Sequence, residues 1–348
     1  MSKILIYWEG FPVCGLLTAD LCNDDNYKVD IFATKPAVPF DRFFESYNVH
    51  PNYAPPENPD DIDLDGYDLL VVTGWDSKYW RSVCKRAKAM GITTCVVVDN
   101  NYRGSLKQVL GALYFRLKLR RLYDYAFCPG VSSQRLLTFL GMPQSNVLFG
   151  NYGAFSKIYH PRLEQGSVKS GFIFVGQFIK RKGVDVLLTA FHKYRAQGGS
   201  WDLSLYGSGD LSELVAPALQ ETEGLKILPF AQPADVARSF RASKVFVLPS
   251  VLEHWGTVVC ESAACGCSLL LSSAVGSAND LLIPGVNGAS FKAGDADELC
   301  AKMHLLEKLD EDWHSQASTV SISQASQKNE KSYSNALKFM LANDNRKR

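Results

Sequence analysis

The sequence predicts an α/β protein made of two Rossmann-like domains, each a doubly wound parallel sheet, which face each other across a cleft. Three observations lead to this fold class. The chain has 348 residues, more than one ordinary domain of ~100 to 200 residues contains. Its residues are 46% apolar, so it can bury sizeable cores. Short apolar runs alternate with helix-length segments throughout, and that alternation is typical of parallel βαβ units.

The first domain is expected to span residues 1–160. Strands are predicted at its short apolar runs, 4–8, 28–32, 69–73, 94–98, 125–128 and 147–149. Helices are predicted in the longer segments between them, 80–90, 106–122 and 132–140. Parallel strands need such crossover segments, because each strand must start again from the same end of the sheet.

A linker is expected at 161–170, where the chain loses its apolar periodicity. The second domain, 171–325, repeats the pattern, with strands at 172–175, 203–206, 225–228, 245–248 and 269–271. Its helices are expected at 184–194, 211–219, 234–241, 257–265 and 296–309. The polar stretch 315–332 is expected to be an exposed connection. The C-terminal helix and tail, 326–348, should contain a last helix at 333–341.

Composition and charge exclude several classes of protein. The 37 basic and 36 acidic residues give a net charge of +1, which predicts no general attraction to nucleic acid. Nine cysteines, mostly within apolar runs, are typical of buried thiols in a reducing compartment. No apolar stretch approaches the ~20 residues of a membrane span, and the N-terminus does not resemble a signal peptide. The expected location is cytoplasmic, with contact at the inner face of the membrane left open.

The most informative stretch is 248–266, which follows a predicted strand and opens a predicted helix. It places Glu253 in the loop and Glu261 eight positions on, in the second turn of the helix. Gly256 allows a ligand to approach the backbone, while the first amides of the helix, from Gly256, Thr257 and Val258, point toward that ligand. This pattern predicts a diphosphate site, and a carboxylate at Glu261 could accept hydrogen bonds from ribose hydroxyls.

This stretch resembles the E-x7-E signature of the retaining family-four glycosyltransferases, which have the GT-B fold. The Pro-Ser before Glu253 and the small-residue helix ending at Gly266 are part of the resemblance. It implies a retaining transfer of a hexose-type sugar from a nucleoside diphosphate sugar, UDP- or GDP-linked, to a hydroxyl acceptor such as a glycan or a lipid-linked sugar. The N-terminal domain would bind the acceptor.

A second block, 174–191, resembles the first strand, loop and helix of the same family's C-terminal domain. Gly176 and the three cations at 180–182 belong to it. Lys182 matches the family's phosphate-binding lysine, and such cations suit a diphosphate whose negative charge grows as the glycosidic bond breaks. Gln177 stands where the family usually has Arg, and Arg181 is the candidate to replace that cation.

Further site residues follow from the same resemblance. Gly207 comes after a strand, and Pro229 with Phe230 lies where the family contacts the base. The family usually has a His after a middle strand, near the sugar, and Asp99 takes that position here.

The resemblance assigns Glu253 and Lys182 to catalysis and Glu261 to the ribose. Asp99, which stands in place of the family's His, is a third catalytic candidate as a polar group facing the sugar or acceptor. No metal site and no cofactor other than the donor substrate are expected. The D-x-D pattern at 61–63 is interpreted as part of a solvated acidic loop.

Two other interpretations of the site stay open. Gln177 and Asp99 depart from the family pattern, which would also suit a weak or inactive sugar-nucleotide-binding subunit of a glycosyltransferase complex. Another enzyme on the same fold, such as an epimerase or a phosphorylase, is the third interpretation.

The predicted helix at 106–122 is basic and amphipathic, and contains aromatic residues. Such a helix can lie on an anionic membrane surface. The alternative is an ordinary buried helix whose cations extend along its sides to reach water.

Overall fold

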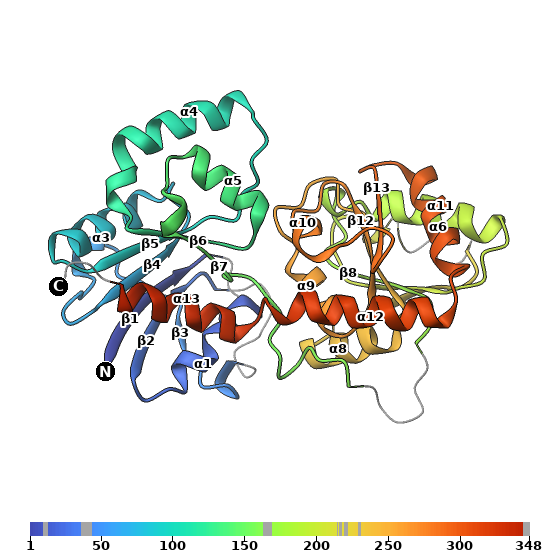
Figure 1. The fold of residues 1–348 in the computed structure, drawn as a ribbon, viewed down its shortest axis with the longest axis horizontal. Coiled ribbons are helices and arrows are strands. Elements are labelled where there is room, and N and C mark those ends of the chain that lie inside the picture. The colour runs from blue at the N-terminus through green and yellow to red at the C-terminus, as the bar shows by residue number, and fades with distance from the viewer. Residues whose placement is uncertain are drawn as a thin grey trace. The chain divides into compact units, whose positions relative to one another are not determined.

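The computed structural model describes residues 1–9, 13–35, 44–162, 169–213, 215, 218, 222–228 and 231–343 (Figure 1). It divides into two compact units. The first comprises Met1–Phe155 together with the C-terminal segment from Lys328, and the second comprises Ser156–Gln327.

The first unit contains a seven-stranded parallel sheet of order β3-β2-β1-β4-β5-β6-β7. Its strands are β1 (Ser2–Trp8), β2 (Tyr27–Ala33), β3 (Pro51–Asn52), β4 (Leu69–Thr73), β5 (Thr93–Val97), β6 (Tyr125–Cys128) and β7 (Val147–Phe149). The central strands are almost wholly buried, as strands covered on both faces must be, and their sequences are therefore mostly apolar.

Helices cover both faces of this sheet (Figure 1). They are α1 (Ala19–Cys22), α3 (Lys78–Ala89), α4 (Leu106–Tyr114), α5 (Val131–Phe139) and α13 (Glu330–Ala342). Short 3₁₀ segments occur at η1 (Val13–Thr18), η2 (Pro59–Asp61) and η5 (Gln144–Asn146). The N-terminus of α3 is capped by Ser77, whose side chain accepts from the Trp80 amide, and that of α4 by Ser105 in the same way from Gln108.

The second unit contains a six-stranded parallel sheet of order β10-β9-β8-β11-β12-β13. Its strands are β8 (Phe172–Val175), β9 (Leu203–Tyr206), β10 (Leu225–Leu228), β11 (Val245–Leu248), β12 (Ser268–Ser272) and β13 (Gly288–Phe291). The strand order reverses between β8 and β11. In open parallel sheets, ligands bind outside the carboxyl ends of the strands at such a reversal.

The helices of the second unit are η6 (Lys180–Lys182), α6 (Val184–Ala196), α8 (Pro233–Ala242), α9 (Thr257–Ala264), α10 (Ala278–Leu281), α11 (Ala296–Glu307) and α12 (Glu311–Ser326). The fold class predicted from the sequence, two parallel-sheet α/β units, is confirmed. The linker expected at 161–170 lies in large part outside the described residues, and so does part of the helix expected at 211–219.

The expected exposed connection at 315–332 was wrong, because α12 occupies most of it. The buried positions of α12 carry small or polar side chains, His314, Ala317, Ser321 and Ala325, so the helix lacks an apolar stripe. Small residues let α12 approach the rest of the unit closely: a Cβ on Gly266 would lie 2.4 Å from Ser318 Oγ. The last helix, α13, packs in the first unit although it follows the second in sequence.

The basic segment predicted as one helix at 106–122 has three parts. α4 is followed by a π-helical segment, η3 (Phe115–Leu119), and a 3₁₀ turn, η4 (Arg120–Leu122). No helix in the described part of the chain is long and apolar enough to cross a membrane.

Candidate active site

The loops after β8 and β11 meet at the strand reversal of the second unit. Their backbones are joined, since the Val251 amide donates to Arg181 O at 2.9 Å. Gly183 lies against the other loop, with φ at +69°, and a Cβ there would come 2.2 Å from Pro249 O. Only glycine permits this contact, because an L side chain would clash with backbone. The two loops therefore form one framework.

The loop after β9 joins the same framework through a second glycine. The Gly176 amide donates to Tyr206 O at 3.0 Å, and Phe178 N donates to Ser208 O at 2.8 Å. A Cβ on Gly207 would lie 1.9 Å from Gly176 O. Gly176 and Gly207, both predicted site residues, thus hold adjacent loops together.

Glu253 is buried at the centre of this framework, with 7% of the residue exposed. Its backbone is tied to the segment after β12: its amide donates to Ala274 O at 3.3 Å, and Gly276 N donates to its carbonyl at 3.2 Å. Ser250 Oγ donates to Glu253 Oε2 at 3.4 Å. The carboxylate therefore has a fixed position before any ligand binds.

Two of the three adjacent cations turn toward Glu253. Lys182 Nζ forms an ion pair with Glu253 Oε2, and both side chains are largely buried. Arg181 Nη1 lies 3.4 Å from the same carboxylate and donates to Leu252 O at 3.0 Å. Lys180, in contrast, is 84% exposed in its side chain and pairs with Asp185 at 2.9 Å. Of the three adjacent cations in the turn η6, two therefore lie beside Glu253 and one lies at the protein surface.

Helix α9 begins beside this carboxylate. Gly256 caps it in a left-handed conformation, with φ at +88°, and no side chain of the described residues forms a capping hydrogen bond. A Cβ on Gly256 would lie 3.2 Å from Glu253 Cγ and 3.3 Å from Leu248 Cδ2. Thr257 and Val258 are partly exposed at the first turn. The positive end of the helix therefore stands next to Lys182, Arg181 and Glu253.

Glu261 is buried one turn further along α9, with 7% of the residue exposed. Burial raises the pKa of this carboxyl to about 8, and a hydrogen bond with Tyr159 opposes the rise. A buried carboxyl with so few donors is protonated in much of the neutral range. It can become a carboxylate when hydroxyl donors are placed beside it.

Several predicted residues lie elsewhere or outside the described residues. Gln177 is exposed in the loop after β8, and Arg181 supplies the cation next to Glu253. Asp99 belongs to the first unit, where its Oδ2 accepts from Tyr152 Oη at 3.2 Å. Pro229 and Phe230 are not among the described residues.

Two side chains that contact the two glutamates carry no clear signal in the sequence. Ser250 belongs to the Pro-Ser pair before Glu253, which does not indicate a contact, and Tyr159 lies in an irregular segment far from Glu261 in sequence. In the same loop, His254 Nδ1 is buried and has no hydrogen-bond partner among the residues that the structure describes. No group of three or more His, Cys, Asp or Glu side chains that could hold a metal ion occurs among the described residues.

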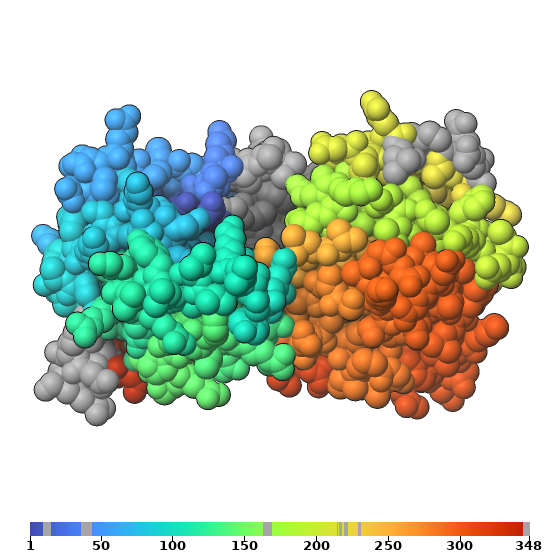
Figure 2. Space-filling view, turned by 90° about the horizontal axis from the view of Figure 1, so that it is seen from above, coloured from blue at the N-terminus to red at the C-terminus, as the bar shows by residue number. Residues whose placement is uncertain are grey.

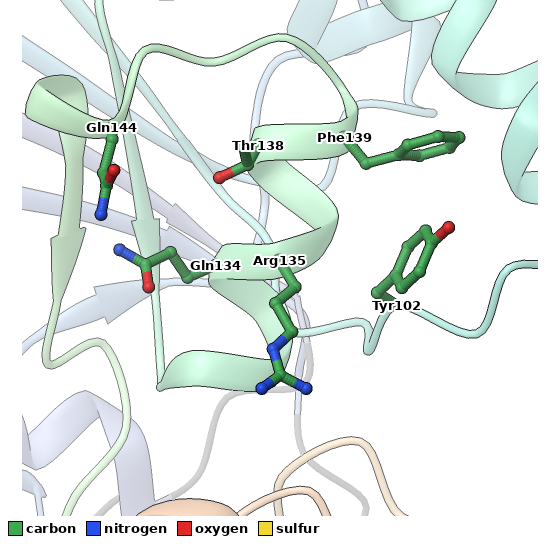
Figure 3. Close-up of a pocket in the computed structure, with 6 residues that line it drawn as sticks. All are labelled: Tyr102, Gln134, Arg135, Thr138, Phe139 and Gln144. Carbon is green, nitrogen blue, oxygen red and sulfur yellow. The ribbon is translucent and has the colours of Figure 1, made fainter.

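The first unit carries an open groove of about 410 Å³ over α5 (Figure 3). Its lining residues are Tyr102, Gln134, Arg135, Thr138, Phe139 and Gln144. The rings of Tyr102 and Phe139 are 5.1 Å apart and form one wall of it. None of these residues was predicted as a site residue.

Comparison with solved structures defines the class of fold. A glycosyltransferase from Rickettsia africae superposes with a TM-score of 0.76 at 12% identity, covering 98% of this chain and 99% of that one. The Anabaena protein HepE, solved in complex with UDP, also gives 0.76, at 14% identity, covering 98% and 100%. The fold is that of GT-B glycosyltransferase structures.

Sequence comparison shows similarity to glycosyltransferases over part of the chain. Residues 159–320 match the family model of the glycosyl transferases group 1, and this range contains Lys182, Glu253 and Glu261. The D-inositol 3-phosphate glycosyltransferase of Mycobacterium ulcerans is 31% identical over 133 residues, which are 37% of this chain. An uncharacterised glycosyltransferase of Methanocaldococcus jannaschii is 26% identical over 133 residues, 38% of this chain. The matches span 28% and 36% of the length of these two relatives.

Proposed function

We propose that this protein is a retaining glycosyltransferase that moves a hexose-type sugar from a nucleoside diphosphate sugar to a hydroxyl acceptor without a metal ion. The observation that carries the proposal is the position of Glu253. It lies between Lys182 and Arg181, beside the N-terminus of α9, at the strand reversal of the second unit.

The donor's diphosphate would bind where the cations meet the helix. Lys182 Nζ has three N–H donors, so it can keep its ion pair with Glu253 and still donate to a phosphate oxygen. The amides of Gly256, Thr257 and Val258 and the guanidinium of Arg181 add further positive potential. Glu261, one turn along α9, is then placed for the ribose hydroxyls, whose donation would favour its charged form.

The same groups would assist bond cleavage. As the sugar separates from the diphosphate, negative charge grows on the leaving oxygen, and fixed cations and amides stabilise it at no cost of reorganisation. Glu253 would face the sugar, which acquires oxocarbenium character. The acceptor hydroxyl would attack from the face that the diphosphate leaves, so the anomeric configuration is retained. Arg181 would supply the positive charge of the family's usual arginine, because Gln177 occupies that arginine's position in this chain.

A UDP-linked hexose is the donor that we propose. HepE has been solved with UDP and with UDP-glucose, and it shares this fold. The acceptor would be a carbohydrate or a lipid-linked sugar bound by the first unit, with Asp99 as a polar group toward the sugar or acceptor. Contact with a membrane is a separate proposal, argued below.

The decisive experiment measures both binding and product. Thermal shift with UDP-, GDP- and ADP-glucose identifies the nucleotide, since a ligand that binds only the folded state raises the melting temperature. Incubation of the preferred donor with a panel of acceptors, followed by NMR of the anomeric proton, should show product of the donor's own configuration. Glu253→Ala should abolish it. An inverted product would exclude the retaining mechanism, and donor binding without turnover would indicate a binding subunit.

A further inference from the structure

Helix α4 and the turn after it have two apolar sides. The inward side is formed by Ala112, Phe115 and Leu119, all of them buried. The outward side is formed by four leucines with large exposed fractions: Leu106 82%, Leu110 70%, Leu113 57% and Leu117 71%. Their spacing of four, three and four residues places them in one stripe along the helix.

An ordinary buried helix, the alternative left open by the sequence, has no second apolar side. Val109 and Tyr114 flank the stripe and are also exposed, so the apolar surface is continuous over three turns. Figure 1 shows α4 on the outside of the first unit, and Figure 2 shows residues of this segment (teal) at the surface. Exposed patches of this kind mark interaction sites, because leucine in water is costly.

The charges beside the stripe have one sign. Residues 100–123 contain no Asp or Glu. Arg103, Lys107, Lys118 and Arg121 are exposed in this segment. Two further arginines bind backbone carbonyls of the same unit, since Arg116 Nη2 donates to Phe139 O at 2.7 Å and Arg120 Nε donates to Gly141 O at 3.0 Å. These two hold the segment against α5 and leave the other four cations for a partner.

We propose that α4 docks on an anionic lipid bilayer, with the leucine stripe in the boundary of the acyl chains and the four cations at the lipid headgroups. The combination of apolar stripe and flanking cations fits this partner in both chemistry and charge. A second copy of the chain fits less well, because a two-fold contact would bring the same cations together. The proposal concerns binding alone and does not depend on the identity of the donor or on catalysis.

Flotation of the full chain with vesicles tests the proposal. Vesicles of phosphatidylcholine with about 30 mol% phosphatidylglycerol should carry the protein upward at low salt, and retention should fall at high salt. Leu110→Ser with Leu117→Ser should weaken partitioning at least ~tenfold, since two inserted side chains are lost. Lys107→Gln with Lys118→Gln should weaken it roughly fivefold per cation on anionic vesicles and hardly at all on neutral ones.

Leu305→Ser with Lys308→Gln is the matched control, since Leu305 and Lys308 are exposed on and just after α11 in the second unit. It should float like the original chain. Thermal unfolding and circular dichroism of every variant establish that the fold is intact. The proposal is overturned if the original chain stays with the lipid-free fraction. It is also overturned if the leucine variant floats equally well, or if light scattering shows a dimer that the leucine substitutions dissociate.

Discussion

Lys180 and Lys182 are two positions apart in sequence but differ in both solvent exposure and ion-pair partner. Lys182 is largely buried against Glu253, whereas Lys180 extends into solvent. The turn η6 imposes this difference, because its three residues point in different directions around a tight helix. The pair therefore offers a matched test of which cation serves the site.

Lys182→Ala is expected to lower kcat by about 10² to 10³, because one fixed donor to the leaving diphosphate is lost. Steady-state kinetics with the preferred UDP-sugar measures this. Lys180→Ala should leave kcat/KM within about a factor of two, as expected for an exposed ion pair. Equal losses in the two variants would contradict the assignment of Lys182 to the diphosphate.

Glu261 makes the stability of the fold depend on pH. Its pKa is about 8 in the folded protein against 4.5 for an ordinary glutamate, so the folded state holds a proton that the unfolded state has lost. The free energy of unfolding should therefore fall as pH rises between these values, by at most ~1.4 kcal/mol per pH unit. Urea denaturation at several pH values should show a flatter profile for Glu261→Gln. Parallel profiles would contradict the raised pKa.

The same residue should couple donor binding to pH. Ribose hydroxyls that donate to Glu261 favour its carboxylate, so binding releases a proton. The Kd for UDP-glucose should fall about tenfold between about pH 6.5 and 8, measured by titration calorimetry. Glu261→Gln should bind more weakly and show little pH dependence. If both proteins had the same pH dependence, Glu261 would not contact the ribose.

At the scale of elements, the site depends on how closely two loops can approach. Gly183 is the N-cap residue of α6, and its left-handed backbone lies against Pro249 O. Gly198 has the same left-handed conformation, with φ at +87°, but a Cβ there would have no atom of the described part of the chain within 4 Å. Substitutions at these two glycines can therefore distinguish the effect of backbone strain from the effect of the contact between the loops.

Gly183→Ala is expected to destabilise the protein by more than ~2 kcal/mol, because the methyl group meets a carbonyl oxygen in addition to the strain. It should also weaken UDP binding, since the loops that carry Lys182 and Glu253 must move apart. Gly198→Ala should cost ~1 kcal/mol and leave UDP binding unchanged. Urea denaturation and calorimetry measure the two quantities. Similar effects from both substitutions would mean that the loop contact is unimportant.

At the scale of the whole molecule, the C-terminal helix α13 packs in the first unit, although in the sequence it directly follows the second unit. Tyr333, Leu337 and Met340 of α13 are fully buried in the first unit. The ring of Tyr333 lies 6.2 Å from that of Trp8 and 5.3 Å from that of Phe127. Helix α13 thus completes the core around the first strand of the chain.

Leu337→Ala is therefore expected to destabilise the first unit selectively, by ~2 to 5 kcal/mol. Hydrogen exchange should become faster in β1 and β6 and stay unchanged in β8 and β11. Asn335→Ala, at an exposed position of the same helix, should change stability by no more than about 0.5 kcal/mol. Faster exchange in both units would contradict the division of the chain.

Much of the fold could be predicted from the sequence because it depends on neighbours in the chain. Several buried strands, β4, β6, β8 and β11 among them, coincide with the short apolar runs that predicted them. The α12 segment could not be predicted in this way. Its buried face carries Ala and Ser in place of large apolar side chains, and only contact with the residues around Gly266 makes that face a core.

The sequence by itself determined the two parallel-sheet units and the spacing of Glu253 and Glu261, since periodicity and motif spacing are local properties. Tertiary structure decided which cations reach Glu253, because Lys182 and Glu253 are 71 residues apart and meet only when β8 and β11 pair. It also decided which side of α4 faces water. Burial depends on what the rest of the chain places against a side chain, and no local pattern contains that information.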